Sequence, residues 1–166
     1  MNDAHLHMVV NHFPIIGTIL GLGILIFSFL FKNISYRNIA YGLFIVSAIF
    51  AFFSMYTGEG AEEIVEDLPN VGRKIIHIHE EFAEKLALLL YLLGLISTAG
   101  LYADYKALSK AKIVAVLALL VSVTAVYLGS LTGTSGGEIR HTEIRTNTQN
   151  TNLETTPNQG KENEKD

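Results

Sequence analysis

The histidines are the residues of this sequence whose type could do chemistry. There are six, and each flanks a long apolar run rather than standing in its middle: His5, His7, His12, His77, His79 and His141. A neutral imidazole is the commonest metal ligand in proteins, and it also ligates haem iron. The chain has no cysteine, which excludes disulfides, thiolate metal sites and haem attachment through cysteine.

The spacing of the histidines limits the sites that they could form. His77 and His79 are two residues apart, which is about 160° around a helix, so only one of them can face into a helix bundle. His77 shares its helix face with Glu81. His7 and His12 are five residues apart and diverge by about 140°. A single helix face therefore cannot hold all of these imidazoles.

Two kinds of cofactor site remain open. A b-type haem takes two axial histidines from different helices at similar depth, and we expect His12 with His79, or with His77, to supply them. A zinc or copper site takes three protein ligands and keeps one open position. We expect His12 and His79 to be the core of either site, completed from the remaining candidates His7, His77, His141 and, for a metal, Glu80. The alternative is that these histidines only cap helices and contact lipid headgroups.

Four long apolar segments must position the histidines. Only 17% of the residues are charged, whereas about 25% is usual in soluble domains. We predict transmembrane helices over about 11–31, 39–56, 77–102 and 113–131, because each run approaches the length needed to cross a hydrocarbon core of about 30 Å. Short connections place consecutive helices antiparallel. The sequence thus predicts an all-α integral membrane four-helix bundle with up-down-up-down topology.

Two segments fall outside these four helices. Gly58 and Gly60 are expected to end the second helix, and the apolar residues of 61–68 recur at helical spacing with an acidic opposite face. That pattern predicts a short interfacial helix between the second and third membrane helices. Residues 146–166 are polar without an apolar pattern, so we expect a disordered tail after a membrane domain of residues 1–145.

Charge predicts the orientation of the chain in the membrane. The short turns at 32–38 and 103–112 carry five Lys or Arg residues against one acid, Asp104. Basic residues in short loops stay on the cytoplasmic side. We therefore expect both termini, the 57–81 segment and all six histidines on the periplasmic side of a bacterial inner membrane.

Four blocks of the sequence are similar to the signature blocks of a known family. They are His-Met-Val-Val-Asn-His-Phe-Pro-Ile at 7–15, Thr-Gly-Glu-Gly-Ala-Glu at 57–62, His-Glu at 79–80 and Gly-Gly-Glu-Ile-Arg-His at 136–141. Over residues 4–145 the chain resembles a bacterial family of small four-helix membrane proteins, catalogued only as a domain of unknown function. It departs from the family at Met8, where proline is common, and at Thr142, where glycine is common. The resemblance implies four helices in an inner membrane and no established reaction.

These observations predict a binding protein rather than an enzyme. The outward-facing histidine cluster would bind haem b or a zinc or copper ion and serve electron transfer with a periplasmic or membrane redox partner. The alternative is a non-catalytic membrane subunit or scaffold without a cofactor. A transporter is disfavoured because the second and fourth helices have few polar interior positions. The expected partners are the lipid bilayer and, in a homo-oligomer, further copies of the chain, with no nucleic acid.

Overall fold

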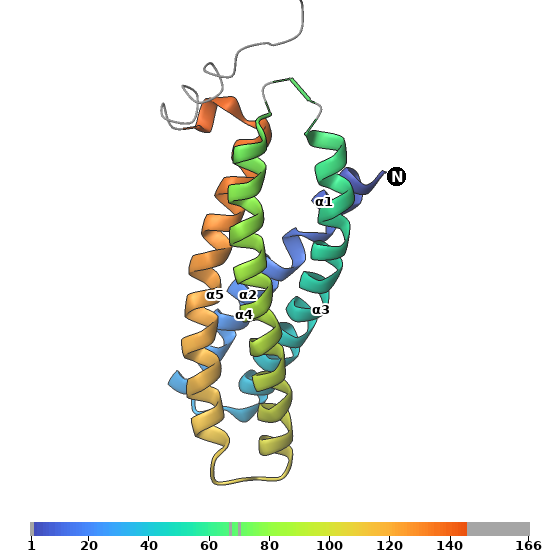
Figure 1. The fold of residues 1–166 in the computed structure, drawn as a ribbon. Coiled ribbons are helices and arrows are strands. Elements are labelled where there is room, and N and C mark those ends of the chain that lie inside the picture. Colours follow the sequence, from blue (N-terminus) through green and yellow to red (C-terminus); the bar gives the residue numbers. More distant parts are fainter. Residues whose placement is uncertain (1, 67, 70, 146–166) are drawn as a thin grey trace, which may run out of the picture.

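The computed structural model describes residues 2–66, 68–69 and 71–145, and these residues form helices and turns with no strand (Figure 1). The predicted all-α class is confirmed. The predicted tail, 146–166, lies outside the described residues. The helices are α1 (Asp3–Val10), α2 (His12–Leu30), α3 (Ile34–Val65), α4 (Arg73–Tyr105) and α5 (Ala111–Arg140), followed by the short 3-10 helix η1 (Thr142–Ile144).

Four helical stretches are long and apolar enough to cross a membrane: α1 with α2, then α3, α4 and α5. With a rise of about 1.5 Å per residue, the 32 residues of α3 and the 33 residues of α4 are both about 50 Å long. A hydrocarbon core is about 30 Å thick, so these helices continue beyond it. Large apolar side chains such as Leu88, Leu95 and Leu120 are exposed on the outer faces, where lipid would solvate them.

The predicted interfacial helix over 61–68 is wrong, because α3 continues without a break to Val65. Gly58 and Gly60 do not end the helix but admit α1. A Cβ on Gly60 would lie 2.6 Å from the Asp3 carboxylate, and one on Gly58 would lie 3.5 Å from the His7 ring. A side chain at Gly60 would crowd Asp3 of α1, whereas one at Gly58 would make an ordinary contact with the His7 ring.

The last three membrane helices are longer at both ends than predicted. The predicted ranges 39–56, 77–102 and 113–131 are only the central parts of α3, α4 and α5. The first predicted helix, 11–31, corresponds to α2, and the chain is already helical upstream of it as α1. The Asn2 side chain begins α1 by accepting a hydrogen bond from the His5 backbone N–H at 3.0 Å. Asn11, which is helical in φ and ψ, joins α1 to α2, and Pro14 follows in the first turn of α2.

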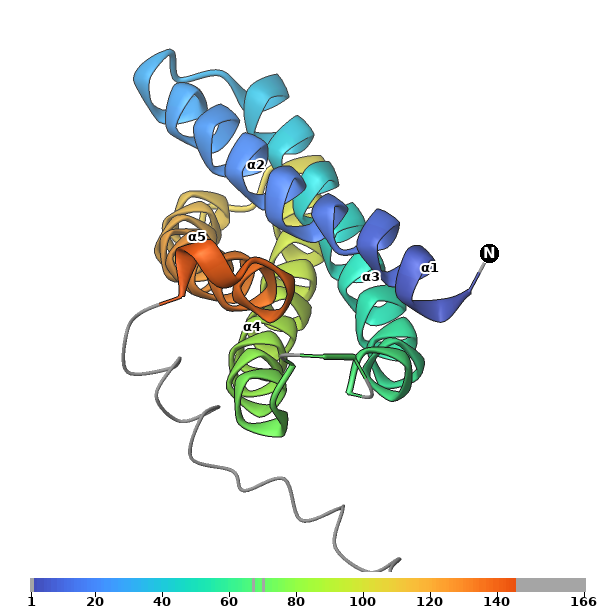
Figure 2. The same cartoon turned by 90° about the horizontal axis from the view of Figure 1, so that it is seen from above.

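The starts and ends of the helices gather at the two ends of the bundle. Figure 1 shows the start of α1, the end of α3, the start of α4 and the end of α5 at the upper end, which we call the histidine end. The connections 31–33 and 106–110 lie at the lower end, which we call the turn end. Lys32 and Ala107 close these connections with φ of 50° each. Viewed from above, α1 and α2 extend across the other helices rather than parallel to them (Figure 2).

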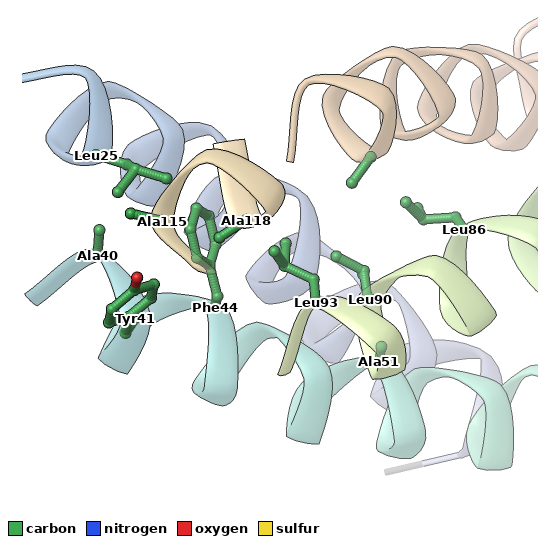
Figure 3. Packing of buried hydrophobic residues seen from close by; sticks show 11 residues of the cluster. Leu25, Ala40, Tyr41, Phe44, Ala51, Leu86, Leu90, Leu93, Ala115 and Ala118 are labelled. Atoms are coloured by element: carbon green, nitrogen blue, oxygen red, sulfur yellow. The ribbon is translucent and has the colours of Figure 1, made fainter. Parts of the chain in front are cut away.

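An apolar core fills the bundle between the two ends (Figure 3). The largest fully buried apolar side chains are Leu25, Phe44, Leu90 and Leu93, together with the ring of Tyr41. Alanines of α5 face them, which allows that helix to pack closely. This layer keeps the polar groups of the two ends apart.

Candidate functional site

His7 is held at the histidine end by α3. Its half-buried imidazole donates from Nδ1 to the carbonyl oxygen of Ser54 at 3.0 Å, and the same nitrogen lies 3.3 Å from the Thr57 hydroxyl. The ring rests against Gly58. A residue of α1 is thus oriented by backbone and hydroxyl groups about two to three turns before the end of α3.

His79 is held in the same way by α5. Its half-buried imidazole donates from Nδ1 to the carbonyl oxygen of Thr132 at 3.1 Å and lies 3.1 Å from the Ser135 hydroxyl. A Cβ on Gly136 would be only 2.9 Å from Cε1 of this ring. The imidazole therefore packs closely on the α5 backbone at Gly136, where a larger residue would displace it.

The two imidazoles share one tautomer. A carbonyl oxygen only accepts hydrogen bonds, so the proton of each neutral ring is on Nδ1, and Nε2 keeps its lone pair. Metal-ligating histidines have this arrangement, in which a carbonyl orients the ring and increases the basicity of the other nitrogen. The two rings are close enough that a charge on His7 would repel a charge on His79. The site is a pair of oriented, neutral imidazoles from two different helices.

The other four histidines are exposed, and three of them, His12, His77 and His141, are among the predicted site residues. His5 and His12 lie on the outer side, and the His12 Nδ1 donates to the Met8 carbonyl of its own helical stretch at 2.6 Å. His77 is 71% exposed and lies beside Glu80 and Glu81. His141 pairs with Glu143 at 2.9 Å.

His12, which was expected to form the core of the site with His79, is exposed rather than turned into the bundle. His12 lies about 140° around a continuous helix from His7, so it turns outward when His7 turns inward. His79 occupies the predicted inward position, and His77 points away as the spacing requires. The structure pairs His79 with His7.

The predicted metal ligands do not come together. Among the described residues, no three His, Asp or Glu side chains are placed to hold one metal ion. His12 and His141 are exposed, and Glu80 lies beside His77 and within hydrogen-bonding reach of Glu62 on α3. Of the six histidines, only His7 and His79 are half-buried rather than exposed.

The groups that orient this pair were not found from the sequence. Ser54, Thr57, Thr132 and Ser135 are not among the site residues that the sequence predicts. In the sequence these residues stand out only as small hydroxyl residues near the end of an apolar run. In the structure each lies at the same depth as a histidine of another helix. That signal becomes specific only when the helix pairs are known.

These features define an all-helical chain with four apolar helices of membrane-spanning length and one pair of inward-facing imidazoles. Comparison with protein-family models, with curated proteins and with solved structures finds no match. The resemblance to a bacterial membrane family remains a prediction from the sequence blocks.

Proposed function

We propose that this chain is a multi-pass protein of the bacterial inner membrane in which His7 and His79 are the axial ligands of a b-type haem that serves electron transfer. The supporting observation is the arrangement of the two rings: each is fixed through Nδ1 to a backbone carbonyl, at 3.0 and 3.1 Å, and each keeps Nε2 for a ligand. The four helices cross the membrane in alternate directions in this proposal.

The donor set fits haem better than zinc. A b-type haem takes two neutral imidazoles from separate helices, which is what the histidine end provides. A catalytic or structural zinc takes three or four protein ligands, and the described residues offer no such group. Gly58 and Gly136 let the two rings pack directly against the backbones of α3 and α5, which helps to fix the direction of each imidazole.

A bound haem would supply one-electron chemistry, and the protein groups would tune and enclose it. The Ser54 and Thr132 carbonyls hold the ring planes and make Nε2 a stronger donor. Below the pair, Ile15 of α2 and Leu86 of α4 pack against Gly129 of α5 and exclude water from that side. Electrons would enter and leave at the histidine end, because the core beneath is apolar.

The orientation follows from the basic turns. Lys and Arg residues at the turn end favour the cytoplasm, which puts the histidine end, both termini and a redox partner on the periplasmic side. The alternative function, a scaffold without a cofactor, requires that His7 and His79 serve only to join α1 to α3 and α4 to α5.

Single substitutions of the histidines separate these functions. We expect His7→Ala and His79→Ala to lose haem from protein expressed with haem available, while His12→Ala and His77→Ala retain it. The measurement is the haem-to-protein ratio of the folded, detergent-purified variants. No haem in the folded parent protein would support the scaffold instead, and equal haem content in all four variants would show that residues other than His7 and His79 hold the haem.

A further inference from the structure

The turn end holds a buried ion pair between α3 and α4. Arg37 donates from Nε to Oδ2 of Asp104 at 2.7 Å and from Nη2 to the other carboxylate oxygen. The side chains are only 12% and 2% exposed. Two parallel hydrogen bonds between planar groups fix their geometry. Buried charges in a membrane protein mark sites where ions or protons are handled more often than sites of mere packing.

Toward the turn end of α3 and α4, three polar atoms have no hydrogen-bond partner among the described residues: Asn38 Oδ1, Tyr41 Oη and Ser97 Oγ. Tyr41 and Ser97 are fully buried. Asn38 follows Arg37 directly, and Tyr41 is one turn further along α3, near enough to interact with the charges of the ion pair. Buried polar atoms in native proteins are almost always hydrogen-bonded, so these three require a partner.

The three atoms belong to one seam. The Tyr41 ring covers Gly100 of α4, where a Cβ would lie 2.8 Å from the tyrosine hydroxyl. Ser97 precedes Gly100 by three residues and therefore lies on the same face of α4. We call this region, lined by Asn38, Tyr41, Ser97 and the ion pair, the polar seam.

Other buried hydroxyls of the bundle differ from those of the polar seam. Ser28 donates to the Leu25 carbonyl at 2.7 Å and Ser122 donates to the Leu119 carbonyl at 2.9 Å, each within its own helix. A tyrosine hydroxyl cannot reach its own backbone in this way. The remaining unpartnered hydroxyl, that of Ser47, faces Gly17 of α2 and lies outside the polar seam.

We propose that the polar seam binds internal water molecules, which bridge the Tyr41 hydroxyl, the Asn38 amide oxygen and the Ser97 hydroxyl and meet the surface at the Arg37–Asp104 pair. Water is the ligand of choice because the charges are already compensated within the pair, and the free groups need a small neutral molecule that both donates and accepts. The seam gives protons access from the turn end as far as Ser97. The apolar layer of Phe44 and Leu93 closes it toward the histidines, so it is a half-channel.

Radiolytic hydroxyl labelling of the full chain in nanodiscs tests this directly, since bound water is activated in place and modifies the side chain that it touches. Tyr41 and Phe44 form a matched pair: both rings are fully buried and lie one turn apart on α3 (Figure 3). We expect Tyr41 to be labelled several-fold faster than Phe44. Equal, low labelling of the two rings would overturn the proposal, and so would equal, fast labelling, because it would show no ordered site.

The melting temperatures of two tyrosine variants give a second, independent test of the bound water. A hydroxyl that is unpartnered in a dry seam destabilises the protein, so Tyr41→Phe would raise the melting temperature. A hydroxyl that binds water stabilises it, and its removal leaves Asn38 and Ser97 unpaired. We expect Tyr41→Phe to lower the melting temperature more than Tyr36→Phe, a control at an exposed position of α3. A rise would contradict the proposal. Neither test depends on haem.

Discussion

Replacing Gly136 by alanine tests how the His79 ring is held. The new Cβ would lie 2.9 Å from Cε1 and 3.2 Å from Nδ1 of His79, whereas carbon atoms in comfortable contact are about 3.5–4.0 Å apart. The ring would have to retreat by roughly 0.5 Å, and its contacts at 3.1 Å with Thr132 and Ser135 would then exceed the distance of a hydrogen bond.

The expected cost follows from three effects. Crowding of a packed site costs about 1–3 kcal/mol, and the lost hydrogen bond costs about 1 kcal/mol more. The higher helix propensity of alanine returns about 1 kcal/mol. The free energy of unfolding should therefore fall by about 1–3 kcal/mol, and the haem content should fall with it because the Nε2 direction changes.

Two matched glycines control for the substitution itself. A Cβ on Gly58 would make an ordinary contact of 3.5 Å with the His7 ring, and one on Gly23 would have no neighbour within 4 Å. Gly23→Ala should be neutral or stabilising by up to about 1 kcal/mol, and Gly58→Ala should change stability less than Gly136→Ala. The assay is equilibrium unfolding in mixed micelles, with the loss of helix monitored by circular dichroism. If Gly136→Ala were as stable as Gly23→Ala and kept its haem, the account of the His79 site would be refuted.

Three further substitutions have defined outcomes in the same unfolding assay. Arg37→Ala leaves the Asp104 carboxylate buried without its partner and should cost about 3–5 kcal/mol; a loss below 1 kcal/mol would mean that the pair is solvated. Leu90→Ala removes a fully buried side chain and should cost about 2–5 kcal/mol, and a neutral effect would argue against the observed core. Gly100→Ala would collide with the Tyr41 ring and should cost about 1–3 kcal/mol, whereas unchanged stability would show that the ring has another position.

The four apolar helices could be predicted from the sequence because outward-facing and core-facing positions are both apolar, so the runs are long and uninterrupted. The residues at which these helices begin and end could not be predicted from the sequence. The charged residues that follow Gly58 and Gly60 indicate a change of environment, and α3 is helical on both sides of that change. Whether a glycine ends a helix or admits a neighbour depends on α1, which approaches from a distant part of the chain.

The histidine pair could be predicted only in part. The spacing of His77 and His79 correctly restricts the inward position to one of them, and the contact of His77 with Glu81 agrees with their shared face. The same geometry relates His7 to His12 but does not tell which turns inward. That choice depends on how α1 packs on α3, and the Ser54 carbonyl that receives His7 is a backbone group without a sequence signature.

The ion pair at the turn end was hidden for a similar reason. Arg37 and Asp104 both stand in segments that were interpreted as polar turns, where charges are normally solvated. The structure extends α3 back to Ile34 and α4 forward to Tyr105, and this places both side chains inside helices that face each other. A small error in helix boundaries thus changes two surface charges into a buried pair.

The central claim, that His7 and His79 are oriented to ligate one haem, is tested most directly by an absorption spectrum. The protein would be expressed with haem available, purified in detergent, and measured oxidised and then reduced with dithionite. The account predicts a Soret band, with α and β bands that sharpen on reduction, at one haem per chain, and the loss of these bands in His7→Ala and His79→Ala. A featureless spectrum of the folded protein, or a haem that survives both substitutions, would contradict it.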